Sequence, residues 1–501
     1  MSPNPIADGR SIRSVVLLEP SPPDTHIFSR FKLPRLGVVL LGTILRDQGY
    51  DVRVMVEDVQ PFDFDAIVSA DLVGISSITP TTGRAYAMAD QLRARQIPVV
   101  MGGPHPTHLA DECLEHADFV IRGEGERALP ELLEAIQGRG ALDAIPNLSY
   151  RAGGIARHNP IASLERDLDQ WPDPDLSLVE GFGAGSFTGL RRVVPIQTSR
   201  GCPYDCSFCT VTTTFGRRMR YRSADRVVAE MSRYDIRKTV FFIYDDNFAA
   251  SPARVRELMA GFRTLPHKPR WSAQVRADVA RDEALLDEMA EAGCYTVFIG
   301  LESVNQETLA QTDKRQDLSE VGTQLRRIRA RKIRIHGMFV LGFDTDTRDT
   351  LDRSVEFARK YDLMSVQFLI LTPFPGSRTH DEMTAEGRIL MDDWSLYDAH
   401  HVCVRPTQIT PAELQRWQTD GHDRFYSVRQ AIQRIFQGRV AEGLLTLYAR
   451  RINRNWLRDN QAYLRTLDEL SQPGAAGEVN HYRREFPAIA AEVERAVAKA
   501  G

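Results

Sequence analysis

Three cysteines lie close together near the middle of the chain, at Cys202, Cys206 and Cys209. Thiolates at this C-x3-C-x2-C spacing can converge on a soft metal centre such as zinc, copper(I) or an iron–sulfur cluster. The other three cysteines are far apart in the sequence, at Cys113, Cys294 and Cys403. A structural zinc site or an ordinary [4Fe–4S] cluster takes four protein ligands. A [4Fe–4S] cluster with three would leave one iron open to a small molecule, which favours catalysis over electron storage.

Two alternatives to a cluster stay open at this point: a zinc site, and three cysteines that are unconnected parts of the core. Disulfide bonds are not expected, because the chain has only six cysteines and its first residues, Met1 to Arg10, lack the apolar segment of a signal peptide. We therefore expect a cytoplasmic protein, a location that would also suit an oxygen-sensitive cluster.

The cysteine motif, with the aromatic Phe208 directly before its last cysteine, resembles the signature of the radical S-adenosylmethionine (SAM) superfamily. The resemblance implies that the three thiolates hold a [4Fe–4S] cluster, that Phe208 belongs to the cofactor site, and that SAM chelates the fourth iron through its amino and carboxylate groups. It also implies that an electron from the cluster cleaves SAM to methionine and a 5′-deoxyadenosyl radical, which abstracts hydrogen.

The composition is ordinary for a globular protein, with 43% hydrophobic and 26% charged residues. At 501 residues the chain is too long for one core, so two or three domains are expected. The net charge of −4 gives no electrostatic reason to expect nucleic acid as a partner. The sequence has no run of about eighteen apolar residues, so no transmembrane segment is expected.

Residues 12–145 alternate between short apolar β-branched runs and helical patterns. The predicted strands are 14–18, 51–57, 72–76, 99–101 and 119–121, and the predicted helices are 36–48, 85–95, 108–116 and 127–136. This alternation is typical of a doubly wound, Rossmann-like α/β domain with a parallel sheet, which binds ligands at the carboxyl ends of its strands.

Two glycine-rich loops follow strands of this first domain. They are either tight βα turns or places where the backbone can approach a large flat or phosphate-bearing ligand. They resemble loops of the cobalamin (B12)-binding domain that precedes many radical SAM modules, although the cobalamin motif D-x-H-x-x-G is absent. The resemblance implies cobalamin as a cofactor, with a histidine that either approaches the cobalt or is structural. The residues expected at this site are Gly102, Gly103, His105, Thr107, Gly123 and Glu124.

Residues 146–192 are expected to be a linker, because residues 171–175 and 181–189 are rich in turn formers. Six strand–helix units are predicted within residues 193–385. Their strands are 193–198, 240–244, 271–276, 296–301, 335–341 and 365–371, and their main helices are 224–233, 254–262, 285–291, 318–330 and 350–360. This pattern suits a partial (βα)6 barrel of the TIM type, the fold that the resemblance implies, in which the chemistry gathers at the carboxyl ends of the strands.

Polar side chains follow the second, third and fourth predicted barrel strands. The resemblance implies that Asp246 meets the amino group of SAM and that Arg276 meets its carboxylate through a bidentate fork. It places Glu302 and Ser303 beside the ribose hydroxyls.

Two basic segments have more than one interpretation. Arg217, Arg218, Arg220 and Arg222 form either a solvated surface or a contact for an electron donor or an anionic substrate. The stretch 423–465 carries nine arginines and three acids among apolar residues. It is either the outer face of a packed helical domain or a segment that lies on an anionic membrane surface.

Residues 386–501 are expected to form a mainly helical C-terminal domain. The segment 394–403 resembles the one after the barrel in a branch of these proteins related to hopanoid-modifying enzymes, where it can cover the barrel mouth. Tyr397, His401 and Cys403 are candidates either for the substrate pocket or for ordinary packing.

The favoured hypothesis is a cobalamin-dependent radical SAM methyltransferase, which removes hydrogen from an unactivated carbon and transfers a methyl group to it. No protein base is required for the abstraction, so no catalytic residue is assigned. The expected partners are a natural-product or lipid-like small molecule and a reducing electron donor such as flavodoxin or ferredoxin. The alternatives are a radical SAM enzyme that forms a ring or C–C bond, or oxidises carbon, without methyl transfer, and a non-catalytic cobalamin or iron–sulfur sensor.

Overall fold

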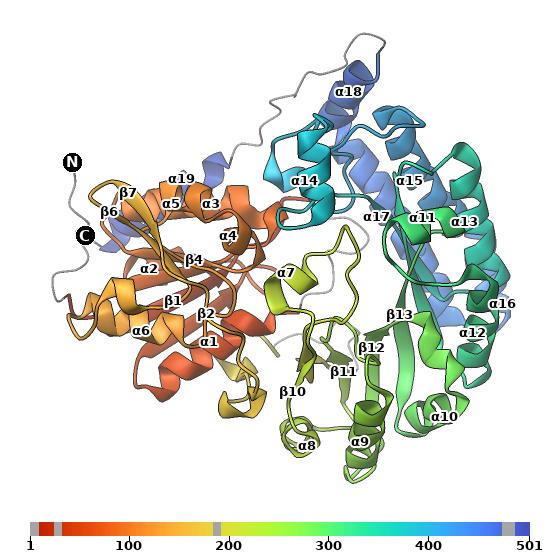
Figure 1. Cartoon of the computed structure of the whole chain (residues 1–501), viewed down its shortest axis with the longest axis horizontal. Helices are drawn as coiled ribbons and strands as arrows, with labels where there is room; N and C mark the ends of the chain where they lie inside the picture. Colours follow the sequence, from red (N-terminus) through yellow and green to blue (C-terminus); the bar gives the residue numbers. More distant parts are fainter. Residues whose placement is uncertain (1–9, 25–32, 184–191, 473–485, 501) are drawn as a thin grey trace.

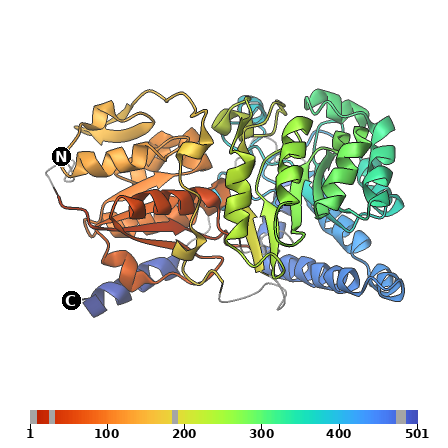
Figure 2. The ribbon, with the colours of Figure 1, turned by 90° about the horizontal axis from the view of Figure 1, so that it is seen from below.

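The computed structural model of the chain describes residues 10–24, 33–183, 192–472 and 486–500. Figure 1 and Figure 2 show, from two sides, an N-terminal α/β domain beside a larger part that contains a second sheet and the C-terminal helices. The start of the chain (residues 1–9) and residues 184–191 of the predicted linker lie outside the described residues.

Seven strands form the sheet of the N-terminal domain: β1 (Ser14–Glu19), β2 (Asp51–Val56), β3 (Leu72–Ser76), β4 (Val99–Gly102), β5 (Phe119–Ile121), β6 (Leu148–Ala152) and β7 (Ile155–His158). Their order in the sheet is β2-β1-β3-β4-β5-β6-β7. The first five are parallel, and β6 and β7 add to the β5 edge in antiparallel fashion. The five parallel strands confirm the predicted sheet.

Helices cover both faces of this sheet. They are α1 (Leu36–Asp47), α2 (Phe64–Val68), α3 (Thr82–Arg93), α4 (Pro104–His108), α5 (Ala110–His116) and α6 (Ala128–Ile136). Alternate residues of a strand point to opposite faces. Accordingly, Val15 and Leu17 of β1 share an apolar cluster with α1 and α6, whereas Val16 and Leu18 share another with α2, α3 and α5. The domain is therefore doubly wound, as predicted.

Two parts of this domain lie outside its predicted boundaries. Strands β6 and β7 occupy residues 148–158, where the sequence pattern predicts the start of a linker. β7 is mostly exposed, which explains its weak apolar signal. The last helix, α19 (Pro487–Ala500), returns to the N-terminal domain and packs Ile489 and Val493 against the cluster of α2 and α3 (Figure 1). Its apolar spacing predicts a helix but not the surface that it covers.

The second sheet contains six parallel strands in chain order: β8 (Arg192–Ile196), β11 (Thr239–Ile243), β12 (Arg270–Val275), β13 (Cys294–Glu302), β14 (Arg334–Leu341) and β15 (Ser365–Ile370). The intervening helices are α8 (Ala224–Ser232), α9 (Pro252–Phe262), α10 (Glu283–Glu291), α11 (Gln306–Gln311), α12 (Leu318–Ala330) and α13 (Arg348–Lys360). These units confirm the predicted partial barrel. After β8, the short antiparallel strands β9 (Ser199–Arg200) and β10 (Arg220–Tyr221) flank the cysteine loop and α7 (Val211–Phe215).

The C-terminal region supplies α14 (Arg378–Ala385), the 3₁₀ helix η6 (Trp394–Leu396), α15 (Pro411–Phe425), α16 (Val428–Phe436), α17 (Val440–Asp459) and α18 (Gln461–Leu470). Side chains on and after α15 form hydrogen bonds with the backbone at the free edge of β15, which could otherwise pair with another strand. The Tyr426 hydroxyl donates to the Val366 carbonyl at 2.7 Å and accepts from its N–H at 2.8 Å. None of the helices in the described ranges combines the length and apolar character needed to cross a bilayer.

Candidate functional site

The three cysteines of the motif lie in the loop between β9 and α7, beyond the carboxyl end of β8. All three are half-buried free thiols. Burial raises the pKa of each thiol, that of Cys209 to about 12. Cys202 further raises the pKa of Cys206, and both raise that of Cys209. Since metals bind the thiolate form, a bound cation is needed to hold all three deprotonated near neutral pH.

The number of thiols distinguishes a cluster from a structural zinc ion. The loop supplies three cysteines, whereas a structural zinc site takes four protein ligands. Three cysteine ligands suit a [4Fe–4S] cluster whose fourth iron is left for a small molecule.

Asp245, at the end of β11, fixes the backbone that leads into the cysteine loop. One carboxylate oxygen accepts from the N–H groups of Thr198 and Ser199 at 2.7 and 3.0 Å. The other accepts from the hydroxyls of the same two residues at 2.5 and 2.7 Å. These bonds tie the first barrel strand to the second just before the first cysteine.

The loop between α11 and α12 holds the cysteine loop from the other side. The N–H of Ser207 donates to the Thr312 carbonyl at 3.2 Å. Arg378 donates to the Asp205 carbonyl and to the Asp313 carboxylate, each at 2.7 Å. The cysteine loop, which follows β8, is therefore also attached to segments that follow β13 and β15.

Arg276, directly after β12, contacts both the cysteine loop and the loop between α11 and α12. Its guanidinium lies 3.8 Å from the centre of the Tyr204 ring and donates to the carbonyls of Lys314 and Arg315 at 2.6 and 3.1 Å. Its charge also acts against burial and lowers the pKa of Cys206. The structure thus places Arg276 beside the cysteines, and its predicted contact with the SAM carboxylate stays a prediction.

Glu302 ends β13 at a shift of register and has a φ of 59°. Its carboxylate binds the buried Lys314 ammonium at 2.5 Å. A Cβ atom at Gly300 would lie 2.3 Å from this carboxylate and 2.9 Å from the ammonium, so a larger residue there would displace the pair from this position. After burial, Lys314 has the largest influence on the pKa of Cys206, which it lowers. The neighbouring Ser303 is buried, and its hydroxyl accepts from a backbone N–H at 3.1 Å.

Asp246 and Asn247 lie at the same edge of the sheet. Asp246 is open to solvent on one side, but desolvation by the surrounding protein and repulsion from Asp245 raise its pKa to about 7. Asn247 is buried beside the thiol of Cys202, and its Oδ1 has no hydrogen-bond partner among the described residues. Phe208 packs its ring against Phe343, with 5.9 Å between ring centres, and so anchors the loop between its last two cysteines.

The predicted glycine loops of the N-terminal domain are connected by hydrogen bonds at the carboxyl ends of its strands. We call this surface, formed by Ser77, Gly102, Gly103, Thr107 and Gly123, the ledge. The N–H of Ser77 donates to the Gly102 carbonyl at 2.9 Å. Gly103 has a φ of 104°, and a Cβ atom there would lie 2.6 Å from the Ser77 carbonyl oxygen. The Thr107 hydroxyl donates to the Gly103 carbonyl and accepts from the Gly123 N–H, both at 2.8 Å.

His105 lies in the short helix α4 rather than in a loop, because Pro104 favours a helix start. The side chain is 1% exposed, its Nε2 is 3.4 Å from the Tyr86 hydroxyl, and its Nδ1 has no partner among the described residues. Burial lowers the pKa of His105 to about 3, so the ring is neutral. It also packs against Trp394 of η6, 5.1 Å between ring centres, which brings the segment after the barrel onto this domain.

The two domains are joined by buried ion pairs at this edge. Glu124 binds Arg200 and Arg220 at 2.9 and 2.7 Å, and Glu126 binds Arg200 at 2.6 Å. These arginines belong to β9 and β10, which flank the cysteine loop. A second contact joins His108 of α4 to Thr214 of α7, 3.3 Å apart, and Figure 1 shows α7 beside the N-terminal domain.

The predicted basic surface after the cysteines is wrong for two of its four arginines. Arg220 is buried against Glu124, and Arg222 is buried against Asp173 and Glu230, each at 2.6 Å. Only Arg217 and Arg218 are exposed. The sequence could not predict this burial, because the run of arginines does not show which carboxylates it meets. Most of those carboxylates, such as Glu124 and Asp173, are distant in the sequence.

The three C-terminal candidates are buried within the helical region. Tyr397 donates to the Met391 carbonyl at 2.8 Å, and the Cys403 thiol lies 3.1 Å from the Leu396 carbonyl. His401 lies 3.0 Å from the Asp398 carboxylate. Their contacts within the fold support the packing interpretation.

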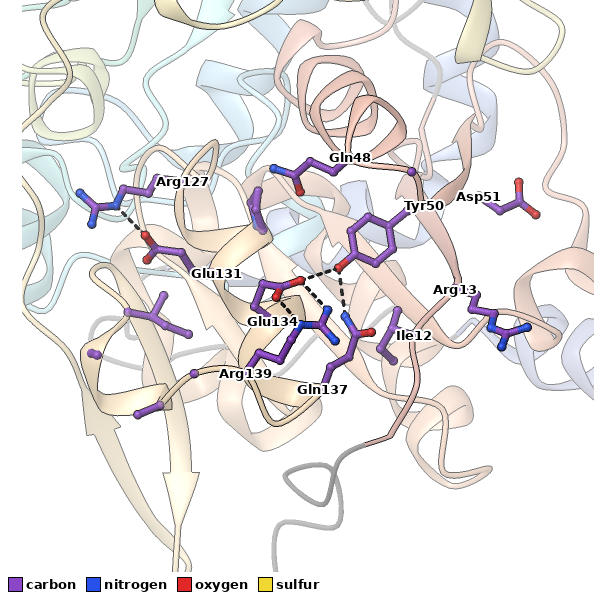
Figure 3. Close-up of a pocket in the computed structure, with 16 residues that line it drawn as sticks. Ile12, Arg13, Gln48, Tyr50, Asp51, Arg127, Glu131, Glu134, Gln137 and Arg139 are labelled. Carbon is purple, nitrogen blue, oxygen red and sulfur yellow. Dashed lines mark hydrogen bonds and ion pairs between the residues drawn. The ribbon is translucent and has the colours of Figure 1, made fainter.

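A hollow of about 970 Å³ lies at the opposite end of the N-terminal sheet, where β2 begins. Figure 3 shows Tyr50, Glu134 and Gln137 joined by hydrogen bonds on its wall, with the Glu134 carboxylate bound to Arg139. The carboxyl ends of the parallel strands face β9, β10 and α7, which flank the cysteine loop, so this hollow is on the side away from the predicted chemistry.

Comparison with known proteins identifies the family. The B12 binding domain family matches residues 29–133, and the Radical SAM superfamily matches residues 196–358. An uncharacterised methyltransferase of Pyrococcus horikoshii is 30% identical over 445 residues, 83% of this chain and 94% of that protein. The bacteriochlorophyllide d C-12(1)-methyltransferase of Chlorobaculum tepidum is 30% identical over 76% of this chain and 79% of its own. The chain belongs to the radical SAM enzymes with an N-terminal B12-binding domain.

Solved structures agree with the fold. The cobalamin-dependent SAM radical enzyme OxsB, with aqua-cobalamin and SAM bound, matches 98% of this chain and 84% of its own, with a TM-score of 0.68 and 15% identity. The radical SAM methyltransferase TsrM from Kitasatospora setae matches 75% of each chain, with a TM-score of 0.60 and 21% identity.

The cofactors of this family are a [4Fe–4S] cluster, SAM and cobalamin, and the residues present fit them. Three thiols in one short loop, beside the buried cations Arg276 and Lys314, suit a cluster. The unpartnered Asn247 Oδ1 leaves an acceptor for an added ligand. At Gly123 a Cβ atom would meet nothing within 4 Å, and at Gly102 the nearest atom would be 3.6 Å away, so the backbone at these two glycines is open to cobalamin. Lys314 was not identified from the sequence, because a lysine in a loop has no distinguishing pattern.

Proposed function

We propose that this protein is a cobalamin-dependent radical SAM C-methyltransferase that acts on a small molecule. The observation that carries the proposal is the ion-paired contact between Glu124 of the B12-binding domain and Arg200 and Arg220 beside the cysteine loop. It supports a shared reaction space between the ledge of the first domain and the mouth of the barrel. When bound, the cluster and SAM supply hydrogen abstraction, and cobalamin supplies the methyl group.

The residues of the chain would hold and orient these groups. Cys202, Cys206 and Cys209 would ligate the cluster, while Arg276 and Lys314 offset their negative charge. Asp246 would accept the amino group of SAM, and Glu302 would accept a ribose hydroxyl on the side away from Lys314. Cobalamin would lie against the ledge of Gly102, Gly103, Thr107 and Gly123. Glu124 would not contact the cofactor, and would instead hold Arg200 and Arg220 in place.

Anaerobic purification and reconstitution test this proposal. We expect about four irons per chain, as a [4Fe–4S] cluster requires, a tightly bound corrinoid, and methylated product together with 5′-deoxyadenosine. Chains with bound corrinoid that form 5′-deoxyadenosine but never a methylated product, over a panel of tetrapyrrole and polycyclic lipid substrates, would contradict methyl transfer.

A cyclase activity is the second candidate. The anaerobic magnesium-protoporphyrin IX monomethyl ester cyclase of Cereibacter sphaeroides is 28% identical over 71% of this chain. A product that has lost hydrogen and gained no carbon would favour this activity.

Substitution of Asp246 by asparagine is expected to weaken SAM binding by about tenfold to a hundredfold, because one charge-assisted hydrogen bond to the amino group is lost. Equilibrium dialysis of the reconstituted protein with labelled SAM measures this change. Asp143→Asn, at an exposed site of the N-terminal domain, is the control. Equal SAM affinity in Asp246→Asn and the wild-type protein would remove Asp246 from the site.

The remaining assignments extend the proposal. We place the functional modules at residues 12–158, 192–385 and 386–472, with α19 as part of the first, on the basis of the two sheets. The electron donor would be a flavodoxin or ferredoxin, and a cytoplasmic location would suit both the donor and the cluster. Arg217 and Arg218, which are exposed beside the cysteine loop, are the candidates for its docking.

A further inference from the structure

The helices α16 and α17 expose apolar side chains that a folded surface normally buries. Phe436 is 88% exposed, and Val428, Ile432, Val440 and Leu444 are between 48% and 57% exposed. Contiguous apolar surface of this kind marks a binding site for a protein or a membrane.

Phe436 and Val440 lie at the tip of a helical hairpin, and the other exposed apolar side chains lie along its two helices. A three-residue turn with Gly438 at a φ of 77° connects α16 to α17. A Cβ atom at Gly443 would lie 2.5 Å from the Ile435 side chain, so the two helices are in close contact. The other face of the hairpin is buried through Ala431 and Arg434. The apolar side chains are therefore exposed although the two helices pack against each other and bury their other face.

The unpaired charges of the hairpin have one sign. Arg429, Arg451 and Arg454 are exposed and form no ion pair with any described residue. The three acids between residues 423 and 465 are all paired: Glu442 is buried against Arg439, Asp423 pairs with Arg450, and Asp459 pairs with Arg458.

The apolar and basic residues of α17 form one stripe. At about 100° per residue, positions 440, 444, 447, 451, 454 and 458 fall on the same face of the helix. The first three are Val, Leu and Leu, and the last three are arginines. The stripe is therefore apolar near the hairpin tip and basic further along, as in helices that insert an apolar end among lipids while cations contact the headgroups.

We propose that this hairpin docks the protein on the surface of a membrane that contains anionic lipid. The occupant is a bilayer rather than a second copy of the chain. A symmetric contact between two copies of the hairpin would bring together unpaired arginines, because the acids of this stretch are already paired, whereas anionic headgroups neutralise these arginines. This proposal is independent of the proposed reaction.

Sedimentation of the full chain with vesicles tests the proposal. We expect binding to vesicles of phosphatidylcholine mixed with phosphatidylglycerol, little binding to phosphatidylcholine alone, and weaker binding as salt is raised. Phe436→Glu is expected to lower the partition coefficient at least about tenfold, because a large apolar side chain no longer enters the lipid. Arg451→Glu combined with Arg454→Glu is expected to abolish the preference for phosphatidylglycerol. Ile155→Glu, at a 62% exposed site on β7, is the matched control and is expected to bind normally.

Three results would overturn the proposal. The first is the absence of binding to anionic vesicles. The second is an equal loss in Phe436→Glu and Ile155→Glu. The third is a wild-type dimer that Phe436→Glu converts to a monomer without any change in vesicle binding, which would assign the patch to self-association.

Discussion

Replacement of Cys206 by alanine is expected to reduce SAM cleavage more than about a thousandfold, which corresponds to about 4 kcal/mol or more of activation free energy. Cys206 lies centrally in the motif, between Cys202 and Cys209, and Lys314 and Arg276 both lower its pKa against the effect of burial. Without it a cluster would have two cysteine ligands. Formation of 5′-deoxyadenosine by the reconstituted protein measures the activity, and iron and sulfide analysis measures the cluster.

Cys294→Ala is the matched control for this experiment. Cys294 is buried in β13. Within the described part of the chain, the polar contact of its thiol is with the Thr296 carbonyl, 3.9 Å away. We expect its variant to retain iron, sulfide and SAM cleavage. A full complement of iron in Cys206→Ala, or an equal loss in Cys294→Ala, would separate the motif from the cluster.

Much of this architecture is predictable because it depends on local sequence patterns. The apolar runs identify all six barrel strands to within about three residues, the scale on which such boundaries are uncertain, and the polar residues after them lie at one edge of the sheet because parallel strands align their carboxyl ends. The cysteine motif identifies its own site because three ligands lie within eight residues.

The contacts between distant segments are not predictable in this way. Glu124 has the glycine neighbours of a ligand-binding turn, and nothing in its spacing identifies Arg220 as a partner. Likewise, the pairing of Glu302 with Lys314 depends on the room that Gly300 leaves. The exposure of Phe436 could not be predicted either, because the apolar residues of a helix have the same spacing whether a neighbouring element or solvent covers them.

Substitution of Glu124 by glutamine is expected to lower the free energy of unfolding by about 3–5 kcal/mol at neutral pH, because two buried arginines lose a charged partner. The side chains of Glu124 and Arg220 are 11% and 4% exposed, so solvent screens them little. Burial alone would raise the pKa of Glu124, but Arg220 and Arg200 outweigh it and lower the pKa below its ordinary value of 4.5. The stabilisation is therefore fully present above about pH 4.5 and is lost as the pH falls through the folded-state pKa. Urea denaturation at several pH values measures the difference from wild type.

Three variants make this result specific to the domain interface. Glu131→Gln removes an exposed ion pair with Arg127 on the same domain and is expected to cost less than about 1 kcal/mol. Arg220→Met combined with Glu124→Gln is expected to be less destabilised than the sum of the single variants, because no charge of that pair then stays buried alone. Since the same ion pairs position the ledge of the B12-binding domain against the cysteine loop, Glu124→Gln is also expected to form less methylated product for each SAM cleaved. Unchanged stability in Glu124→Gln, or strict additivity in the double variant, would show that these contacts do not hold the two domains together.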